Sequence, residues 1–245
     1  MNWKQLTASL ALTGVALSAV HGAVITKPYT FNINGGVIPD NNLSGWQNTQ
    51  PISDWTGIPY FITKVQVSLT MSGGFNGDLY AYLSHDGGAT GSGFSVLLNR
   101  IGRSSTSESG YSTSGFINLA LSSEGATDVH FSGGAQTGTW QPDGRILSPL
   151  SNASDFDTAL RPGALFSSFK NLDPNGTWNL FIADVSPGSV STITEWGMEI
   201  TAVPEPRVGL VISFVGIGAG LGKLLIRRRK VTPSVVPSAR RSDNS

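Results

Sequence analysis

The stretch Phe61-Ile62-Thr63-Lys64-Val65-Gln66-Val67-Ser68-Leu69-Thr70-Met71 decides the fold class, because apolar and polar side chains alternate along it. Its odd-numbered positions are mainly apolar: Phe61, Thr63, Val65, Val67, Leu69 and Met71. The even-numbered positions include the polar residues Lys64, Gln66, Ser68 and Thr70. Successive side chains of a strand point to opposite faces, so the pattern predicts a strand that buries its odd-numbered side.

The same alternation resumes after a glycine-rich turn region at 72–77. From Asp78 to Leu83, we expect Leu79, Ala81 and Leu83 to be buried, and Tyr80 and Tyr82 to face the other side. Further strands are expected near Thr30–Asn34, Phe94–Ile101, Gly115–Leu121, Thr177–Val185 and Ile193–Thr201, the last with Trp196, Met198 and Ile200 on one face. Residues 102–110 and 133–157 have the composition of long surface loops. Short strands with Gly-rich turns and no helical periodicity favour an antiparallel sandwich or jelly roll.

Composition excludes several classes of function. The chain has no cysteine, which rules out disulfides and thiolate chemistry. Residues 24–203 carry seven cationic and fourteen anionic side chains, a net charge of −7. Such a domain repels nucleic acid, but it could bind hard cations such as Ca²⁺.

Residues 1–23 have the pattern of a secretory signal peptide. Lys4 supplies the positive start, Leu6–Val20 the apolar core, and Gly22 and Ala23 the small residues at which signal peptidase would cut. An uncleaved N-terminal anchor is the alternative. Export would place the domain at 24–202 outside the cytoplasm.

The C-terminal part has three consecutive features. Val203-Pro204-Glu205-Pro206 is followed by an apolar run of 19 residues, Val208–Ile226, and then by Arg227-Arg228-Arg229-Lys230. A helix of that length reaches about 28 Å, close to the ~30 Å hydrocarbon core of a bilayer. The basic cluster favours anionic lipid and the cytoplasmic side, so the pattern predicts one transmembrane helix with the domain outside.

Residues 203–230 resemble the PEP-CTERM sorting signal of exported bacterial proteins. In that family a Pro-Glu-Pro motif, a transmembrane helix and an Arg-rich end are recognised by the membrane protease exosortase. The resemblance implies that the helix holds the protein at the inner membrane until cleavage near Pro204-Glu205-Pro206 releases it to the cell surface or extracellular matrix. A single-pass anchor that is never cleaved is the alternative. The polar, Pro- and Ser-rich tail at 231–245 is typical of disorder.

A second resemblance covers roughly residues 28–201. Three segments carry it: Ile38-Pro39-Asp40-Asn41 with Gly45-Trp46; Asn76-Gly77-Asp78-Leu79 with the strand before it and Asp86-Gly87-Gly88 after it; and Asn175-Gly176-Thr177-Trp178 through Asp184 with Thr192–Ile200. In this order they look like the P domain (P/Homo B) found beside subtilisin-type proteases. The resemblance implies a jelly-roll β-sandwich. It also implies that Asp40, Asp78 and Asp184 could hold Ca²⁺, and the alternative is that these carboxylates simply brace turns.

No catalytic pattern accompanies these segments. Outside the leader the histidines are His85 and His130, and neither belongs to a nucleophile, base or metal motif. His85-Asp86 is expected in a solvated hairpin turn. We therefore expect no enzyme, but an exported structural or adhesive protein of the envelope or exopolysaccharide matrix.

Two alternatives remain. One is a carbohydrate- or protein-binding module in which exposed aromatic residues stack on a ligand, and the candidates are Trp46, Trp55, Trp140, Tyr80 and Tyr82. The other is a hydrolase with an unrecognised site.

Overall fold

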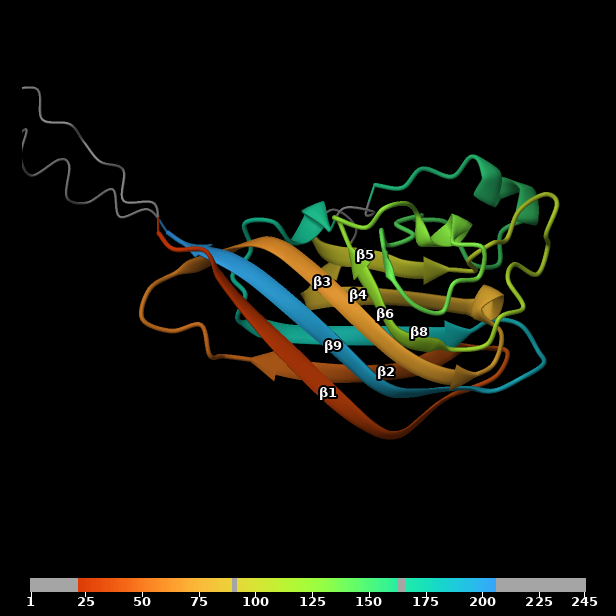
Figure 1. Cartoon of the computed structure of the whole chain (residues 1–245), viewed down its shortest axis with the longest axis horizontal. Helices are drawn as coiled ribbons and strands as arrows, with labels where there is room; N and C mark the ends of the chain where they lie inside the picture. The colour runs from red at the N-terminus through yellow and green to blue at the C-terminus, as the bar shows by residue number, and fades with distance from the viewer. Residues whose placement is uncertain (1–21, 90–91, 163–165, 206–245) are drawn as a thin grey trace, which may run out of the picture. The chain divides into compact units, whose positions relative to one another are not determined.

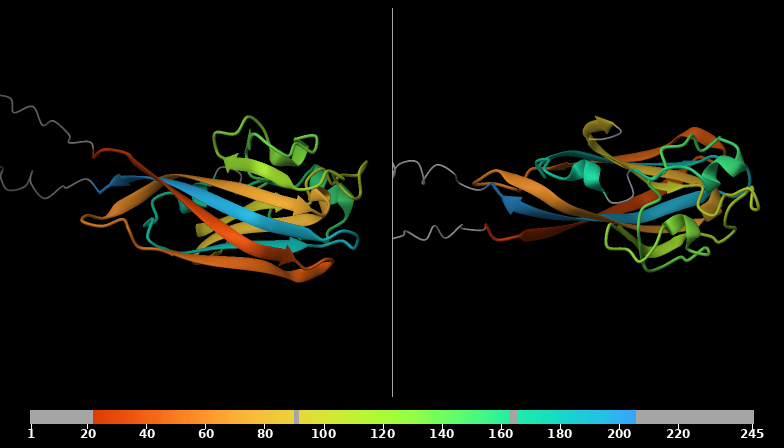
Figure 2. Two further views of the ribbon diagram at one scale, coloured as in Figure 1. Left: turned by 60° about the horizontal axis from the view of Figure 1, so that its bottom comes forward. Right: turned by 90° about the horizontal axis from the view of Figure 1, so that it is seen from above.

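The structure is a computed structural model that describes residues 22–89, 92–162 and 166–205. The described chain is all-β, and its strands form two sheets that face each other as a β-sandwich (Figures 1 and 2). Its helical segments are short 3-10 turns: η1 (Asn76–Asp78), η2 (Val129–Phe131), η3 (Ala153–Asp157) and η4 (Ser167–Phe169).

The first sheet has five strands in the order β1-β9-β3-β6-β7, and the second has four in the order β2-β8-β4-β5. The bounds of the first sheet are β1 (Ile25–Ile38), β9 (Ser191–Pro204), β3 (Tyr60–Gly73), β6 (Phe116–Ser122) and β7 (Thr139–Trp140). Those of the second are β2 (Asn42–Ile52), β8 (Gly176–Asp184), β4 (Leu79–Ala89) and β5 (Ser92–Asn99). Neighbouring strands are antiparallel except β6 and β7, which pair in parallel.

Each of the predicted strands overlaps a strand of the structure, with ends that differ by up to two residues where they run past it, but β2 and β7 were not expected. The polar positions of β2 explain the first omission. Asn48 and Gln50 belong to the side of β2 that faces the core, where Asn48 accepts a hydrogen bond from the indole of Trp196 at 2.9 Å. A strand with polar residues on its inner side shows no apolar alternation.

The prediction for 61–71 is confirmed from Val65 onward and is wrong before it. Val65, Val67, Leu69 and Met71 are buried, but so is Ile62, whereas Thr63 is exposed. The register with β9 shifts between Ile62 and Lys64, which marks a β-bulge. One extra residue reverses the side to which the preceding side chains point.

The core lies between the sheets and contains one tryptophan from each of them. Trp178 on β8 and Trp196 on β9 are both 0% exposed. The indole of Trp178 donates to the carbonyl of Pro174 at 3.1 Å, and that of Trp196 donates to Asn48. Both rings therefore bury a large apolar area without leaving their N–H groups unpaired. Leu79, Ala81 and Leu83 are buried as predicted.

The two ends of the described chain lie at the same end of the sandwich. Ile25 pairs with Ala202, and Tyr60 pairs with Pro204. The predicted leader up to residue 21 and everything from Pro206 onward, including the expected transmembrane helix and Arg227–Lys230, lie outside the described residues. Within those that are described, no helix has the length and apolarity needed to cross a membrane.

Truncating Leu69, which is 0% exposed in the centre of β3, tests this core. We expect Leu69→Ala to lower the free energy of unfolding by about 2–5 kcal/mol, because it leaves a cavity between the sheets. Urea unfolding measures the change. The control is Ser68→Ala on the opposite face of the same strand, for which we expect less than about 0.5 kcal/mol. Equal losses for the two variants would contradict the assigned faces of β3.

Candidate functional site

A row of aromatic rings crosses the outer face of the four-stranded sheet. Tyr82 on β4 is paired in register with Phe181 on β8, and the two rings stack with centroids 4.8 Å apart. On the other side of Tyr82, the ring of Phe94 on β5 lies 5.0 Å away. Tyr80, two residues earlier on β4, meets Tyr82 edge-on at 6.2 Å. Three adjacent strands thus contribute to one continuous aromatic surface.

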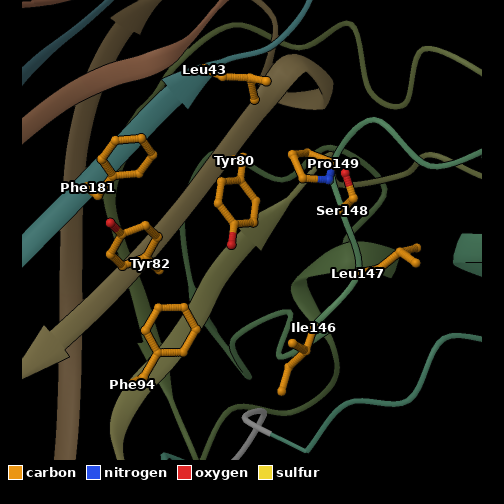
Figure 3. Close-up of a pocket in the computed structure, with 9 residues that line it drawn as sticks. All are labelled: Leu43, Tyr80, Tyr82, Phe94, Ile146, Leu147, Ser148, Pro149 and Phe181. Atoms are coloured by element: carbon orange, nitrogen blue, oxygen red, sulfur yellow. The ribbon is translucent and has the colours of Figure 1, made fainter. Parts of the chain in front are cut away.

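This surface forms the floor of an open pocket with a volume of about 480 Å³ (Figure 3). Leu43 borders it beside β8, and a segment formed by Ile146, Leu147, Ser148 and Pro149 borders it on the side of Tyr80. Among the residues that the structure describes, no charged side chain lines the pocket. Rings and aliphatic side chains form most of its walls, which suits a ligand with an uncharged, partly apolar face.

Gly45 allows Phe181 to lie in this row. A Cβ atom at Gly45 would be 2.7 Å from Cζ of Phe181 and 2.5 Å from the carbonyl oxygen of Ile182. Its φ of 57° is also one that glycine adopts more readily than other residues. The Phe181 ring therefore packs directly on the backbone of β2.

The polar atoms of the pocket are available to a ligand. Neither phenol hydroxyl, of Tyr80 or of Tyr82, has a hydrogen-bond partner among the described residues. Burial raises the pKa of both phenols, and for Tyr80 the charges of Tyr82 and Asp143 raise it further. Both side chains therefore remain neutral hydroxyls that can donate and accept hydrogen bonds.

The structure brings two of the five predicted stacking residues into the pocket and places the other three elsewhere. Tyr80 and Tyr82 come together in the pocket, as their shared face of β4 predicts. Trp46 and Trp140 are partly buried against the core cluster and do not line the pocket. The expectation that Trp55 is exposed is wrong: it is 4% exposed, meets Tyr60 edge-on at 5.2 Å, and lies under the ammonium group of Lys27 at 4.6 Å.

Sequence reasoning missed Phe94 and Phe181 as pocket residues. Each faces outward from its own strand, so alternation could have suggested their exposure. Only the register, which sets Phe181 beside Tyr82, shows that they share one surface.

A second polar group lies at the end of the sandwich where β4 begins and β8 ends. Asp78 and Asp184 are buried there, and the guanidinium of Arg100 donates to Asp78 at 3.3 Å and to Ser186 at 2.8 Å. Asp40 accepts the backbone N–H of Gly188 at 3.2 Å, and Asp184 accepts that of Ser186 at 3.3 Å. The three aspartates proposed as calcium ligands therefore lie in one region and act on one another through their charges.

These contacts match the bracing of turns. Among the residues that the structure describes, no three histidine, aspartate or glutamate side chains are grouped so that they could hold a metal ion. Arg100 already brings a positive charge to Asp78. Calcium binding by Asp40, Asp78 and Asp184 stays a prediction.

Asp184 is the least satisfied carboxylate of this group. It is 0% exposed, and its Oδ2 has no hydrogen-bond partner in the described structure. Burial raises its pKa from 3.8 to about 6, and the charges of Asp78 and Asp40 add to this increase. The N–H of Ser186 and the charge of Arg100 oppose it. Ionised Asp184 therefore destabilises the fold.

The two histidines outside the predicted leader are both buried. His85 is 6% exposed, lies 4.4 Å from the ring of Trp178, and bonds the carbonyl of Asn175 at 3.0 Å. The predicted solvated turn is therefore wrong for His85, whereas Asp86 beside it is exposed. His130 is 1% exposed, and each of its ring nitrogens faces an oxygen atom of the protein.

His130 belongs to a buried network of charges that fastens the long loops. Arg145 bonds Asp128 at 2.8 Å and Asp143 at 3.1 Å. Arg161 contacts the same oxygen of Asp128 at 3.0 Å. The segment 133–157, predicted as a surface loop, therefore carries buried residues that anchor it to the sandwich. Residues 102–110 are half-buried or exposed, as expected for a surface loop.

The described residues of the predicted processing sites lie side by side. Gly22 is so close to Pro204 that a Cβ atom at Gly22 would collide with that ring, and Ala23 follows on the way into β1. Val203 and Pro204 are the last residues of β9, two residues beyond the predicted domain end. Glu205 donates its N–H to the carbonyl of Pro59 at 3.0 Å. The start of the motif is therefore paired with β3.

Replacing Asp184 with asparagine tests the buried charge. The pKa of Asp184 is raised in the folded state, so protonated Asp184 favours folding. This contribution to stability is complete below about pH 4 and is lost as pH rises through about 6. We expect the wild type to lose about 3 kcal/mol of stability between pH 4 and pH 7 on this account, and Asp184→Asn to lose much less. Urea unfolding at several pH values measures this. The partly exposed Glu195→Gln serves as control, and a wild-type profile that does not fall with pH would contradict the prediction.

No protein-family model matches this chain, and no curated protein sequence matches it. Among solved structures, the serine protease of Aeromonas sobria in complex with the chaperone ORF2 is similar to it with a TM-score of 0.44 and 15% identity, over 75% of this chain and 28% of the protease chain. The same protease by itself gives a TM-score of 0.41 and 14% identity, over 73% and 27%. The chain thus spans less than a third of the length of the proteins it resembles.

Proposed function

We propose that this protein is an exported, non-catalytic binding module of the bacterial envelope or extracellular matrix, and that its aromatic pocket binds a neutral glycan. The observation that carries the proposal is the row Phe94–Tyr82–Phe181 with Tyr80 beside it, open to solvent. Aromatic rings present large, rigid contact surfaces with a polar edge, which suits the apolar face of a sugar ring. The unpaired hydroxyls of Tyr80 and Tyr82 can bond the hydroxyl groups of that sugar.

Charge favours a neutral ligand over an acidic one. The domain between residues 24 and 203 has a net charge of −7, and none of the described residues that line the pocket is cationic. Both features disfavour anionic polysaccharides and nucleic acid. A protein ligand with apolar side chains remains the alternative.

The position of the pocket also fits this role. β3 leads from Tyr60, beside the chain ends, to Gly73 at the opposite end, and β4 starts there with Leu79. Tyr80 and Tyr82 therefore lie in the half of the sandwich away from Pro204. The described chain leaves the sandwich after Glu205, at the end away from the pocket.

The finer classification rests on sequence. We propose a jelly roll of the P-domain type, a leader removed by signal peptidase near Gly22 or Ala23, and sorting by exosortase at Pro204-Glu205-Pro206. Membrane lipid would contact the apolar run and its basic cluster until cleavage, and exopolysaccharide or envelope proteins would be the later partners. Both ring nitrogens of His130 already face acceptors of the protein, which supports a non-catalytic role.

Removing the central ring of the row tests glycan binding. We expect Tyr82→Ala to weaken binding of a neutral glycan by about tenfold or more, because it deletes the ring that contacts both neighbours. The measurement is a glycan array followed by calorimetry on the strongest neutral hit. Tyr82→Phe keeps the ring and removes the hydroxyl, and so distinguishes their contributions to glycan affinity.

The control for this experiment is Phe75→Ala, because Phe75 is 39% exposed but does not line the pocket. It should leave affinity unchanged. Binding that survives Tyr82→Ala, or a preference for acidic glycans, would contradict the assignment of the pocket.

The intact mass of the mature protein from envelope and matrix fractions of its native host tests the sorting proposal. We expect a chain that begins near Gly22 or Ala23 and ends near Pro204–Arg207. A product that still carries Ile226–Ser245 would show a permanent anchor instead, without affecting the pocket.

A further inference from the structure

The ring of His130 lies between two oxygen atoms that accept hydrogen bonds. Nδ1 lies 2.8 Å from Oδ2 of Asp143, and Nε2 lies 2.9 Å from the carbonyl oxygen of Arg103. A carboxylate and a carbonyl are both acceptors. A neutral imidazole has a single N–H and can bond only one of them, whereas an imidazolium donates to both. Both contacts are hydrogen bonds only if the ring of His130 carries two protons.

Charged and aromatic side chains surround His130. Asp143 is 0% exposed and faces the ring, and Asp128 accepts the backbone N–H of His130 at 2.9 Å. The other charged groups around the network are Arg145 and Arg161, which bond these aspartates, Arg103, and the aspartates 155 and 157 of η3. The ring of Phe156 on η3 stacks on His130 at 5.9 Å, and Phe131 meets it edge-on at 5.3 Å.

The same network continues into the wall of the aromatic pocket. Asp143 and Gly144 donate their backbone N–H groups to the carbonyls of Leu97 and Val96 on β5 at 3.0 and 2.9 Å. Asn99 on β5 then donates to the carbonyls of Arg145 and Leu147 at 3.3 and 2.9 Å. The next residues, up to Pro149, form the wall beside Tyr80.

We propose that His130, held as an imidazolium by Asp143 and the carbonyl of Arg103, is the positioning residue for this pocket wall. This inference rests on the proposed glycan-binding role for its functional meaning. If the ring loses its second proton, one ring nitrogen presents a lone pair to the oxygen atom beside it. Neither of these two buried atoms then receives a hydrogen bond. Such an unsatisfied buried pair is unfavourable enough to loosen the segment 142–149 from β5. The affinity of the pocket is then coupled to the charge of one residue that does not line it.

Nitrogen NMR of the full-length chain in detergent tests the first step. The two ring nitrogens of an imidazolium have similar ¹⁵N chemical shifts, whereas those of a neutral ring differ widely. We expect similar shifts for His130 at neutral pH. A neutral ring under these conditions would overturn the proposal.

Hydrogen exchange tests the second step without any ligand. We expect His130→Gln, whose amide cannot donate in both directions, to speed exchange of the Asp143 and Gly144 amides by about tenfold, with no change in β9. His85→Gln is the matched control, because His85 is also buried but bonds Asn175 outside the pocket. If His130→Gln fails to fold, the wild type decides: exchange at these two amides, corrected for intrinsic rates, should rise as the ring loses its second proton.

Glycan affinity completes the test. For the neutral glycan that binds best, we expect His130→Gln to weaken binding about tenfold and His85→Gln to leave it unchanged. Faster exchange with unchanged affinity would show that His130 has a structural role only. Absence of any glycan binding would contradict the proposed function, while the NMR and exchange results would still decide how the wall is held.

Discussion

The pairing of β9 with both β1 and β3 is the constraint on which the rest of the structure depends. β9 is the last strand of the described chain, yet it lies between β1 and β3 and is paired with them along most of its length. This position buries Trp196 opposite the second sheet and brings the two ends of the described chain to one end of the sandwich. Most of its contacts join residues far apart in sequence, so the fold forms only when both ends of the domain are present.

The parts of the fold that could be predicted from sequence are those in which one face of a strand is apolar. Val65, Val67, Leu69 and Met71 show this, and so do Leu79, Ala81 and Leu83. The prediction failed where a hydrogen bond replaces apolar packing, as for Asn48 beneath Trp196. It also failed at the bulge near Thr63, where apolar Ile62 and polar Thr63 interrupt the alternation and the register with the partner strand shifts.

The residues of the candidate site also differ in how far the sequence predicts them. Tyr80 and Tyr82 were expected together because they are two residues apart on one strand, and that spacing holds in any register. Phe94 and Phe181 join them through pairing between strands that are distant in sequence. The wall at 146–149 depends on a longer chain of contacts still, through Asn99 and the backbone of Asp143. Pattern reasoning loses accuracy as the number of non-local contacts that define a site increases.

The buried charges show why these loops are ordered although their sequence suggests surface loops. A buried carboxylate or guanidinium is unfavourable unless partners surround it, and once they do, removing any one partner leaves the others unsatisfied. Asp143 has such partners in Arg145 and His130, which fix the path of the chain beside β5. Asp184 has fewer partners, because its Oδ2 is unpaired in the described structure. Its ionisation therefore destabilises the fold where β4 begins. The two clusters thus differ in whether each buried charge is matched. The matched cluster borders the aromatic pocket, where a ligand needs a wall that does not move.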